Sequence, residues 1–314
     1  MTRAPLAAAL AEGVVVLDGG LATELEARGH DLGSALWSAR LLAEDPDAVV
    51  AAHRAYLDAG ARVATTASYQ ASFAGLAAAG VDRADAEALL RSSVTLADRA
   101  REESGDPDGC WVAASVGPYG AALADGSEYR GDYDLTVDQL RAWHRPRLEV
   151  LADAGADVLA LETVPCLAEA EALALEVQRL GVPAWLSLTC DGLRTRAGEP
   201  VAEAFALAAD VPELVAVGVN CTDPADADAL VALAAQRSGL PVVVYPNSGE
   251  TWDAAGRRWS GPSRFSPAQV RGWTAAGARL VGGCCRVGPD DIVALAATLR
   301  DAPAALLAPV GGPA

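Results

Sequence analysis

Short, largely apolar runs recur along the chain, and each is followed by a small or polar residue and then by a helical pattern. The eight runs lie at residues 14–18, 62–66, 111–115, 157–162, 184–188, 214–220, 242–245 and 279–283. Because their apolar positions are continuous rather than alternating, they predict strands buried on both faces, as in a parallel sheet covered by helices.

The intervening segments have helical periodicity. They span residues 47–59, 85–103, 136–154, 168–180, 203–209, 225–237, 267–276 and 289–300. A weak repeat, Ala-Gly-Ala at 59–61, 154–156 and 276–278, closes three helices just before a strand, where glycine can adopt the left-handed conformation that ends a helix.

Eight strand–helix units in about 300 residues predict an α/β fold, a single (β/α)8 TIM barrel over residues 1–314. A doubly wound open sheet is the alternative, but its Gly-x-Gly-x-x-Gly fingerprint is missing after the first strand. The long connections 21–45 and 249–266 follow the first and seventh strands. We expect them to wall a pocket at the carboxyl ends of the strands.

Composition narrows the function. The chain is 52% hydrophobic and 21% charged, which excludes a disordered protein. A net charge of −18 argues against nucleic-acid and anionic-membrane partners and leaves small-molecule substrates. All 24 basic residues are arginine, so Schiff-base, pyridoxal-lysine and Walker-type chemistry are excluded. The N-terminal segment has neither a signal-peptide nor a membrane-helix pattern, and six cysteines suggest no disulfide framework, so we expect a cytoplasmic protein with reduced thiols.

Three cysteines follow predicted strands: Cys221 after the sixth, and Cys284 and Cys285 after the eighth. Three thiolates with one open position make a good Zn²⁺ site, expected here at the C-terminal ends of strands 6 and 8 with one ion per chain. A redox-sensing Cys284–Cys285 pair is the alternative. Buried apolar packing is the simpler interpretation for Cys110, Cys166 and Cys190.

The absence of histidine ligands shapes the expected chemistry. None of His30, His53 and His144 follows a predicted strand, whereas hydrolytic zinc centres usually use histidine and carboxylate ligands. An all-thiolate centre is a poor activator of water, but it suits an incoming thiol, which it would hold deprotonated and nucleophilic. Thiol alkylation is therefore the expected reaction class, without a protein nucleophile.

A set of motifs along nearly the whole chain resembles the homocysteine S-methyltransferase family, and most closely its S-methylmethionine-dependent, cobalamin-independent branch. The motifs are DGGLATEL at 18–25, LWSA at 36–39, TASYQAS at 66–72, SVGPYGA at 115–121, DGSEYRG at 125–131, ETVP at 162–165, GVNCT at 218–222, YPNSGE at 245–250 and GGCCR at 282–286. No single motif is specific, but the set is.

This resemblance implies Zn²⁺ on Cys221, Cys284 and Cys285, with the homocysteine sulfur as the fourth ligand. It also implies that the homocysteine ammonium meets Glu162 and the carbonyl of Asp18, while the carboxylate meets backbone N–H groups of the Gly19–Leu21 turn. The expected homocysteine-binding residues are Asp18, Gly19, Gly20, Leu21, Glu162 and Asn220. Two alternatives stay open: Asp18 as a helix N-cap, and Glu162 in a rim ion pair with an arginine.

The methyl donor implied by the resemblance is S-methylmethionine or S-adenosylmethionine, and the product is methionine. A cationic sulfonium suits an acidic, aromatic mouth, for which the candidates are Glu128, Tyr129, Tyr133 and Trp252. Another donor or acceptor, such as betaine or selenocysteine, is the alternative within the family. A non-catalytic zinc-thiolate or redox-sensing barrel is the alternative from a different class.

Overall fold

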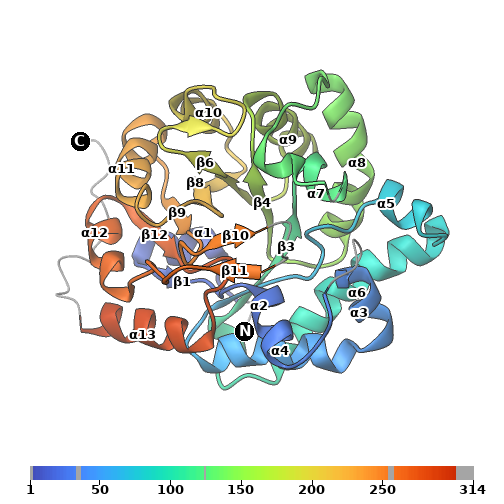
Figure 1. Ribbon diagram of the computed structural model, residues 1–314, viewed down its shortest axis with the longest axis horizontal. Coiled ribbons are helices and arrows are strands. Elements are labelled where there is room, and N and C mark those ends of the chain that lie inside the picture. Colours follow the sequence, from blue (N-terminus) through green and yellow to red (C-terminus); the bar gives the residue numbers. More distant parts are fainter. Residues whose placement is uncertain (1–2, 33–36, 124, 254–257, 302–314) are drawn as a thin grey trace.

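A closed parallel barrel forms the centre of the computed structural model, which describes residues 3–32, 37–123, 125–253 and 258–301 (Figure 1). Its strands are β1 (Val15–Val16), β2 (Val63–Thr65), β3 (Trp111–Val116), β4 (Val158–Val164), β5 (Ala184–Leu188), β8 (Leu214–Asn220), β9 (Val242–Tyr245) and β12 (Ala278–Val281). They are hydrogen-bonded in the order β1-β12-β9-β8-β5-β4-β3-β2, and a parallel bridge between Leu17 and Val63 joins the two ends. The predicted (β/α)8 barrel is confirmed.

Helices surround the barrel in the positions that the periodicity predicts. They are α4 (Pro46–Asp58), α6 (Arg83–Glu102), α8 (Val137–Asp153), α9 (Leu167–Leu180), α10 (Val201–Ala208), α11 (Ala227–Ser238), α12 (Val270–Ala275) with η3 (Pro267–Gln269), and α13 (Pro289–Arg300). The repeated glycines Gly60, Gly155 and Gly277 all have positive φ after α4, α8 and α12. Their predicted role in ending these helices is therefore confirmed.

The apolar core has two layers, one inside the barrel and one between the strands and the surrounding helices. Side chains such as Trp185, Ala216 and Leu280 fill the interior, while their strand neighbours pack outward against the helices. Leu6 and Leu10 of α1 (Leu6–Glu12) join the interior layer, so α1 closes one end of the barrel. None of the described helices is long and apolar enough to cross a membrane.

Shorter elements extend the strand–helix connections. The connection after β1 carries α2 (Leu21–Ala27) and α3 (Trp37–Glu44), and that after β2 carries α5 (Phe73–Ala78). After β3 come α7 (Tyr119–Leu123) and η2 (Ser127–Tyr129), while η1 (Pro107–Gly109) precedes β3. Two antiparallel hairpins follow β5 and β9: β6 (Cys190–Asp191) with β7 (Arg194–Thr195), and β10 (Thr251–Asp253) with β11 (Arg258–Ser260).

Candidate functional site

A cavity of about 270 Å³ opens at the carboxyl ends of the barrel strands. Its walls include Thr65 of β2, Ser115 of β3, Glu162 of β4, Asn220 of β8 and Tyr245 of β9. The turn that follows β1 and the loop that follows β12 complete the lining. This is the end of a (β/α)8 barrel where active sites are built, as the sequence predicts.

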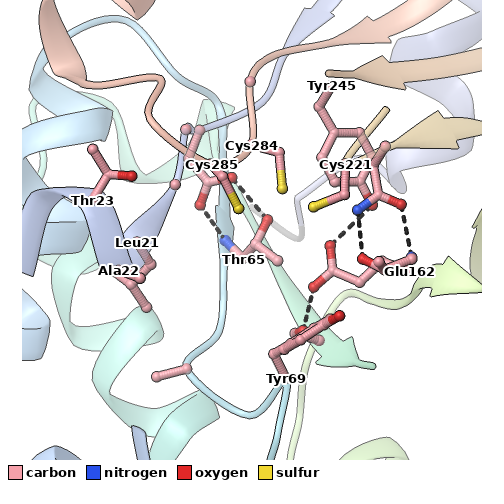
Figure 2. A pocket seen from close by; sticks show the side chains of 18 of the residues that line it. Leu21, Ala22, Thr23, Thr65, Tyr69, Glu162, Cys221, Tyr245, Cys284 and Cys285 are labelled. Atoms are coloured by element: carbon pink, nitrogen blue, oxygen red, sulfur yellow. Dashed lines mark hydrogen bonds between the residues drawn. The ribbon is translucent and has the colours of Figure 1, made fainter. Parts of the chain in front are cut away.

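The three predicted metal ligands meet in this cavity. The sulfur atoms of Cys221, Cys284 and Cys285 all lie within 4.8 Å of one another, and Figure 2 shows them converging. Zinc–sulfur bonds of about 2.3 Å in a tetrahedral site place the sulfurs about 3.8 Å apart, so the trio fits a zinc ion. Hydrogen bonds from the Cys221 and Cys284 thiols hold the pKa of Cys285 well below its usual range, which favours a thiolate ligand.

Backbone contacts fix the loop that carries two of these thiols. The Cys284 N–H donates to the Pro246 carbonyl at 2.8 Å, and the Cys285 N–H donates to Asn247 Oδ1 at 3.2 Å. Gly283 must remain glycine because a Cβ atom there would lie 2.1 Å from Val287 Cγ1. The loop after β12 therefore packs against the loop after β9, and this packing aims both thiols at Cys221.

Asp18 lies at the end of the first strand run and is only 5% exposed. Its carboxylate accepts hydrogen bonds from the Thr65 N–H at 2.6 Å and the Thr65 hydroxyl at 2.8 Å. Helix α2 instead begins after Gly20 and has no side-chain cap, so the N-cap interpretation of Asp18 is wrong. Burial raises the pKa of Asp18 to about 7, against the opposing effect of the Thr65 hydrogen bonds.

The glycine turn after Asp18 lines the cavity, as the expected carboxylate site requires. The Gly20 N–H is already engaged, because it donates to the Val287 carbonyl at 3.0 Å. A Cβ atom at Gly20 would lie 2.7 Å from the Cys284 carbonyl oxygen. The turn therefore packs directly on the cysteine loop, and this contact brings the expected carboxylate site next to the thiols.

Glu162 is a buried carboxylate whose hydrogen-bond partners are all neutral. One oxygen accepts from the Ser115 hydroxyl, and the other accepts from the Tyr245 hydroxyl at 3.0 Å. Among the ion pairs of the described residues, none includes Glu162, so the alternative of a rim pair with an arginine is wrong. Burial raises the pKa of Glu162 to about 7. A buried carboxylate with no cationic partner is suited to an incoming ammonium group.

The expected donor residues separate into two groups. Glu128 and Tyr129 line the cavity, and Glu128 Oε2 is buried without a hydrogen-bond partner in the described part of the chain. Tyr133 is not among the lining residues, and its ring packs edge-on against Tyr119 with 5.2 Å between centroids. Trp252 lies in β10, and its side chain is outside those that the structure describes.

Several cavity residues received no role from the sequence. Tyr69 and Gln70 follow β2 and line the cavity, which their position after a strand could have indicated. Ser115 and Tyr245 lie inside apolar runs, where the pattern marks them only as strand residues. In the structure their hydroxyls are the groups that hold Glu162.

Comparison with known proteins identifies the same family as the sequence motifs. The sequence model described as "Homocysteine S-methyltransferase" matches residues 15–299. The chain belongs to the homocysteine S-methyltransferase family. The homocysteine S-methyltransferase of Escherichia coli (strain K12) is 48% identical over 294 residues, which cover 90% of this chain and 94% of the relative. Homocysteine S-methyltransferase 4 of Zea mays is 45% identical over 312 residues, which cover 93% and 91%.

Solved structures agree with this assignment. The crystal structure of the homocysteine methyltransferase MmuM from Escherichia coli in its metallated form superposes with a TM-score of 0.82 at 46% identity. The match covers 91% of this chain and 96% of the MmuM chain. Family membership therefore confirms the resemblance inferred from the sequence motifs.

Proposed function

We propose that this protein is a zinc-dependent methyltransferase that moves a methyl group from S-methylmethionine to the thiol of L-homocysteine and so forms methionine. The observation that carries the proposal is the convergence, in one cavity, of three thiols with two buried carboxylates, Asp18 and Glu162, near the glycine turn. Metal ligands, an ammonium site and a carboxylate site are what a thiol amino acid requires.

In this proposal Cys221, Cys284 and Cys285 hold the zinc ion. Bound there, zinc would lower the pKa of an incoming thiol and leave the thiolate nucleophilic. Glu162 receives the homocysteine ammonium together with the Asp18 carbonyl, while the Gly19 and Leu21 N–H groups of the turn receive the carboxylate. Ser115 and Tyr245 orient Glu162 through its two oxygens.

The reaction is an in-line displacement. A new bond forms between the homocysteine sulfur and the methyl carbon as the methyl–sulfonium bond breaks, and the donor leaves as neutral methionine. Glu128 and Tyr129 are the proposed donor contacts, because both line the cavity and a carboxylate with an aromatic ring suits a cationic sulfonium. Positioning both reactants in one cavity supplies much of the rate enhancement, without a protein nucleophile or general base.

The chemistry of the chain also supports the remaining expectations. We propose one domain over residues 1–314, small-molecule partners, and a cytoplasmic location. The location rests on the six free thiols, three of them needed as metal ligands, which require a reducing compartment. The net charge of −18 supports partners other than nucleic acid.

Methyl transfer tests the proposal directly. Zinc-loaded protein is incubated with homocysteine that carries an isotope label in its carbon backbone and with unlabelled S-methylmethionine, and methionine is analysed by mass spectrometry. We expect labelled methionine, and parallel reactions with S-adenosylmethionine and betaine rank the donors. No labelled product from any donor, in protein shown to hold zinc, would refute the proposed function.

A further inference from the structure

Asn220 is the residue whose structural role departs most from the expectation that it binds substrate. It ends β8, immediately before Cys221, and it is completely buried. Its side-chain oxygen accepts hydrogen bonds from the Thr163 N–H at 2.7 Å and the Ser187 hydroxyl at 2.8 Å. Its NH₂ group donates to the Thr163 hydroxyl at 2.8 Å. Both ends of this amide are therefore engaged by the protein.

The partner of this amide lies in an irregular part of the sheet. In the pairing of β4 with β5, Leu161 faces Leu186 and Val164 faces Leu188. Two residues, Glu162 and Thr163, therefore lie opposite Ser187 alone, which is the geometry of a β-bulge. A bulge leaves a backbone N–H without its partner in the ladder, and the Asn220 oxygen accepts the Thr163 N–H.

The bulge brings Thr163 into the cavity beside Glu162. Ala160 faces the barrel interior, and Leu161 packs outward against the helices. Regular alternation would then turn Glu162 inward and Thr163 outward, yet both line the cavity. Thr163 achieves this with a φ of 61°, which is strained for a β-branched side chain. Such a conformation persists only where the surroundings hold it. The Asn220 amide does so through hydrogen bonds with the N–H and the hydroxyl of Thr163.

We propose that Asn220 is a positioning residue of the methyl-transfer site: its amide holds Thr163 in the bulge and thereby keeps the Glu162 carboxylate aimed at the ammonium of homocysteine. The inference rests on the proposed function for the identity of the ligand. Because Cys221 follows Asn220 directly, the same residue links the ammonium site to the metal ligands. Homocysteine needs both sites at a fixed separation, whereas the methyl donor needs neither.

The test measures the two substrates separately. Zinc-loaded Asn220→Ala should keep one zinc per chain, while its homocysteine affinity, measured by calorimetry, and its homocysteine KM both weaken by about tenfold. The KM for S-methylmethionine should change by less than about twofold. Unchanged homocysteine affinity, loss of zinc, or equal weakening for both substrates would overturn the positioning role.

Combining Asn220→Ala with Thr163→Gly tests whether Asn220 acts through Thr163. Glycine adopts a positive φ without strain, so Thr163→Gly should make the Asn220 amide less necessary. We expect Asn220→Ala to weaken homocysteine binding by less than about threefold in the Thr163→Gly background, against about tenfold alone. Equal effects in both backgrounds would show that Asn220 does not act through Thr163.

Two further readouts keep the inference testable. If Asn220→Ala does not fold, Thr163→Val removes the hydroxyl that accepts from Asn220 while keeping the side-chain shape, and it should weaken homocysteine but not donor binding. Unchanged homocysteine binding in a folded Thr163→Val protein would overturn the inference. Calorimetry requires no turnover, so absence of methyl transfer by the unmodified enzyme would refute the proposed function separately.

Discussion

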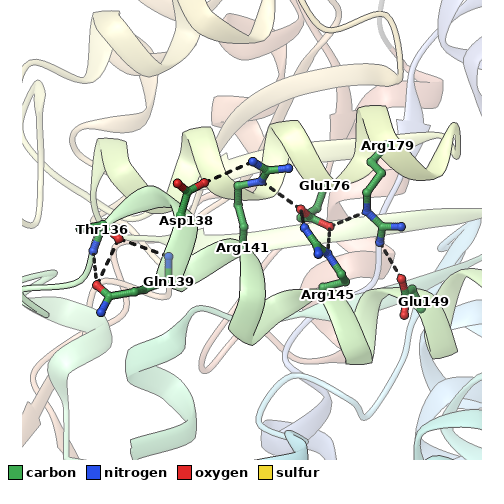
Figure 3. Close-up of polar contacts among 8 residues, drawn as sticks. All are labelled: Thr136, Asp138, Gln139, Arg141, Arg145, Glu149, Glu176 and Arg179. Carbon is green, nitrogen blue, oxygen red and sulfur yellow. Dashed lines mark hydrogen bonds and ion pairs between the residues drawn. The ribbon is translucent and has the colours of Figure 1, made fainter.

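Replacing Glu176 by glutamine should destabilise the packing of α8 on α9. The Glu176 side chain on α9 is completely buried and makes ion pairs with three arginines (Figure 3). Arg141 and Arg145 of α8 approach one carboxylate oxygen at 3.0 and 2.9 Å. Arg145 also donates to the other oxygen at 3.0 Å, which Arg179 of α9 approaches at 2.7 Å. Glu176→Gln keeps the shape and removes the charge that these three cations share.

The size of the effect follows from the pKa of this carboxyl group. Burial alone would raise the pKa of Glu176, but hydrogen bonds from the three arginines outweigh burial and lower it from 4.5 to about 2. A shift of this size corresponds to about 3 kcal/mol of stabilisation of the ionised form. The arginines are 28–42% exposed, and solvent screening reduces this to about 2 kcal/mol. For a chain of this length, that loss lowers Tm by about 3 °C.

The assay is thermal and urea unfolding at pH 7, with Glu149→Gln as the control. Glu149 is 49% exposed and pairs with Arg179 at 2.9 Å, so its replacement should cost less than about 0.5 kcal/mol. Because the folded-state pKa of Glu176 is depressed, its contribution is present above about pH 4.5 and is lost as pH falls toward 2. The difference between the unmodified protein and Glu176→Gln should therefore close over that range. Equal stability of the unmodified protein and Glu176→Gln at pH 7, or a stability difference between them that persists at pH 2, would refute this reasoning.

Three other substitutions test the site and the barrel. Cys284→Ser should abolish zinc retention, measured by metal analysis, and activity, measured by the methyl-transfer assay. The control Cys110→Ser lies outside the thiol cluster and should preserve both. An active, zinc-free Cys284→Ser protein would contradict the proposal. Glu162→Gln should raise the homocysteine KM by about 10- to 100-fold through the lost charge on its acceptor, with zinc retained, and zinc loss would show a misassigned role. Gly218→Ala should prevent folding, seen by circular dichroism, because its Cβ would lie 1.8 Å from a β9 carbonyl oxygen. Gly288→Ala, which has open space around it, should fold, and a stable Gly218→Ala protein would contradict the packing argument.

The barrel was predictable because its strands are buried on both faces. Burial of both faces produces continuous apolar runs, and these runs coincide with all eight barrel strands. Their ends were less predictable: the run at 14–18 yields only Val15–Val16 as β1, since Leu17 forms an isolated bridge and Asp18 turns into the cavity. A run of apolar residues does not reveal where ladder hydrogen bonds stop.

Elements stabilised by tertiary contacts were not predicted. Helix α1 has seven residues, too few for clear periodicity, and it is held by Leu6 and Leu10 inside the barrel. The hairpin of β10 and β11 lies within a segment that the sequence identifies only as a long connection. The partners that hold α1 are distant in sequence, so a local pattern carries little signal for this helix. The strands of the hairpin have only three residues each, too few for a clear alternation.

The convergence of the three cysteines was predictable for the same reason as the strands. Parallel strands of a barrel end at one face, so cysteines directly after two strands converge there. The role of Asn220 was not predictable, because it depends on a one-residue bulge in another strand. The apolar run at 157–162 has no alternation in which an extra residue could be seen.

Two residues with positive φ, Thr163 and Cys221, explain how so small a cavity is lined by so many functional groups. A regular strand end directs one of two consecutive side chains into the barrel. At the end of β4 the consecutive residues Glu162 and Thr163 both line the cavity, and at the end of β8 so do Asn220 and Cys221. The second member of each pair has a positive φ, 61° for Thr163 and 47° for Cys221. Local backbone strain thus brings two consecutive side chains of each strand into the cavity. It places Glu162, the proposed ammonium contact, and Cys221, the proposed metal ligand, on backbones joined through the Asn220 side-chain amide.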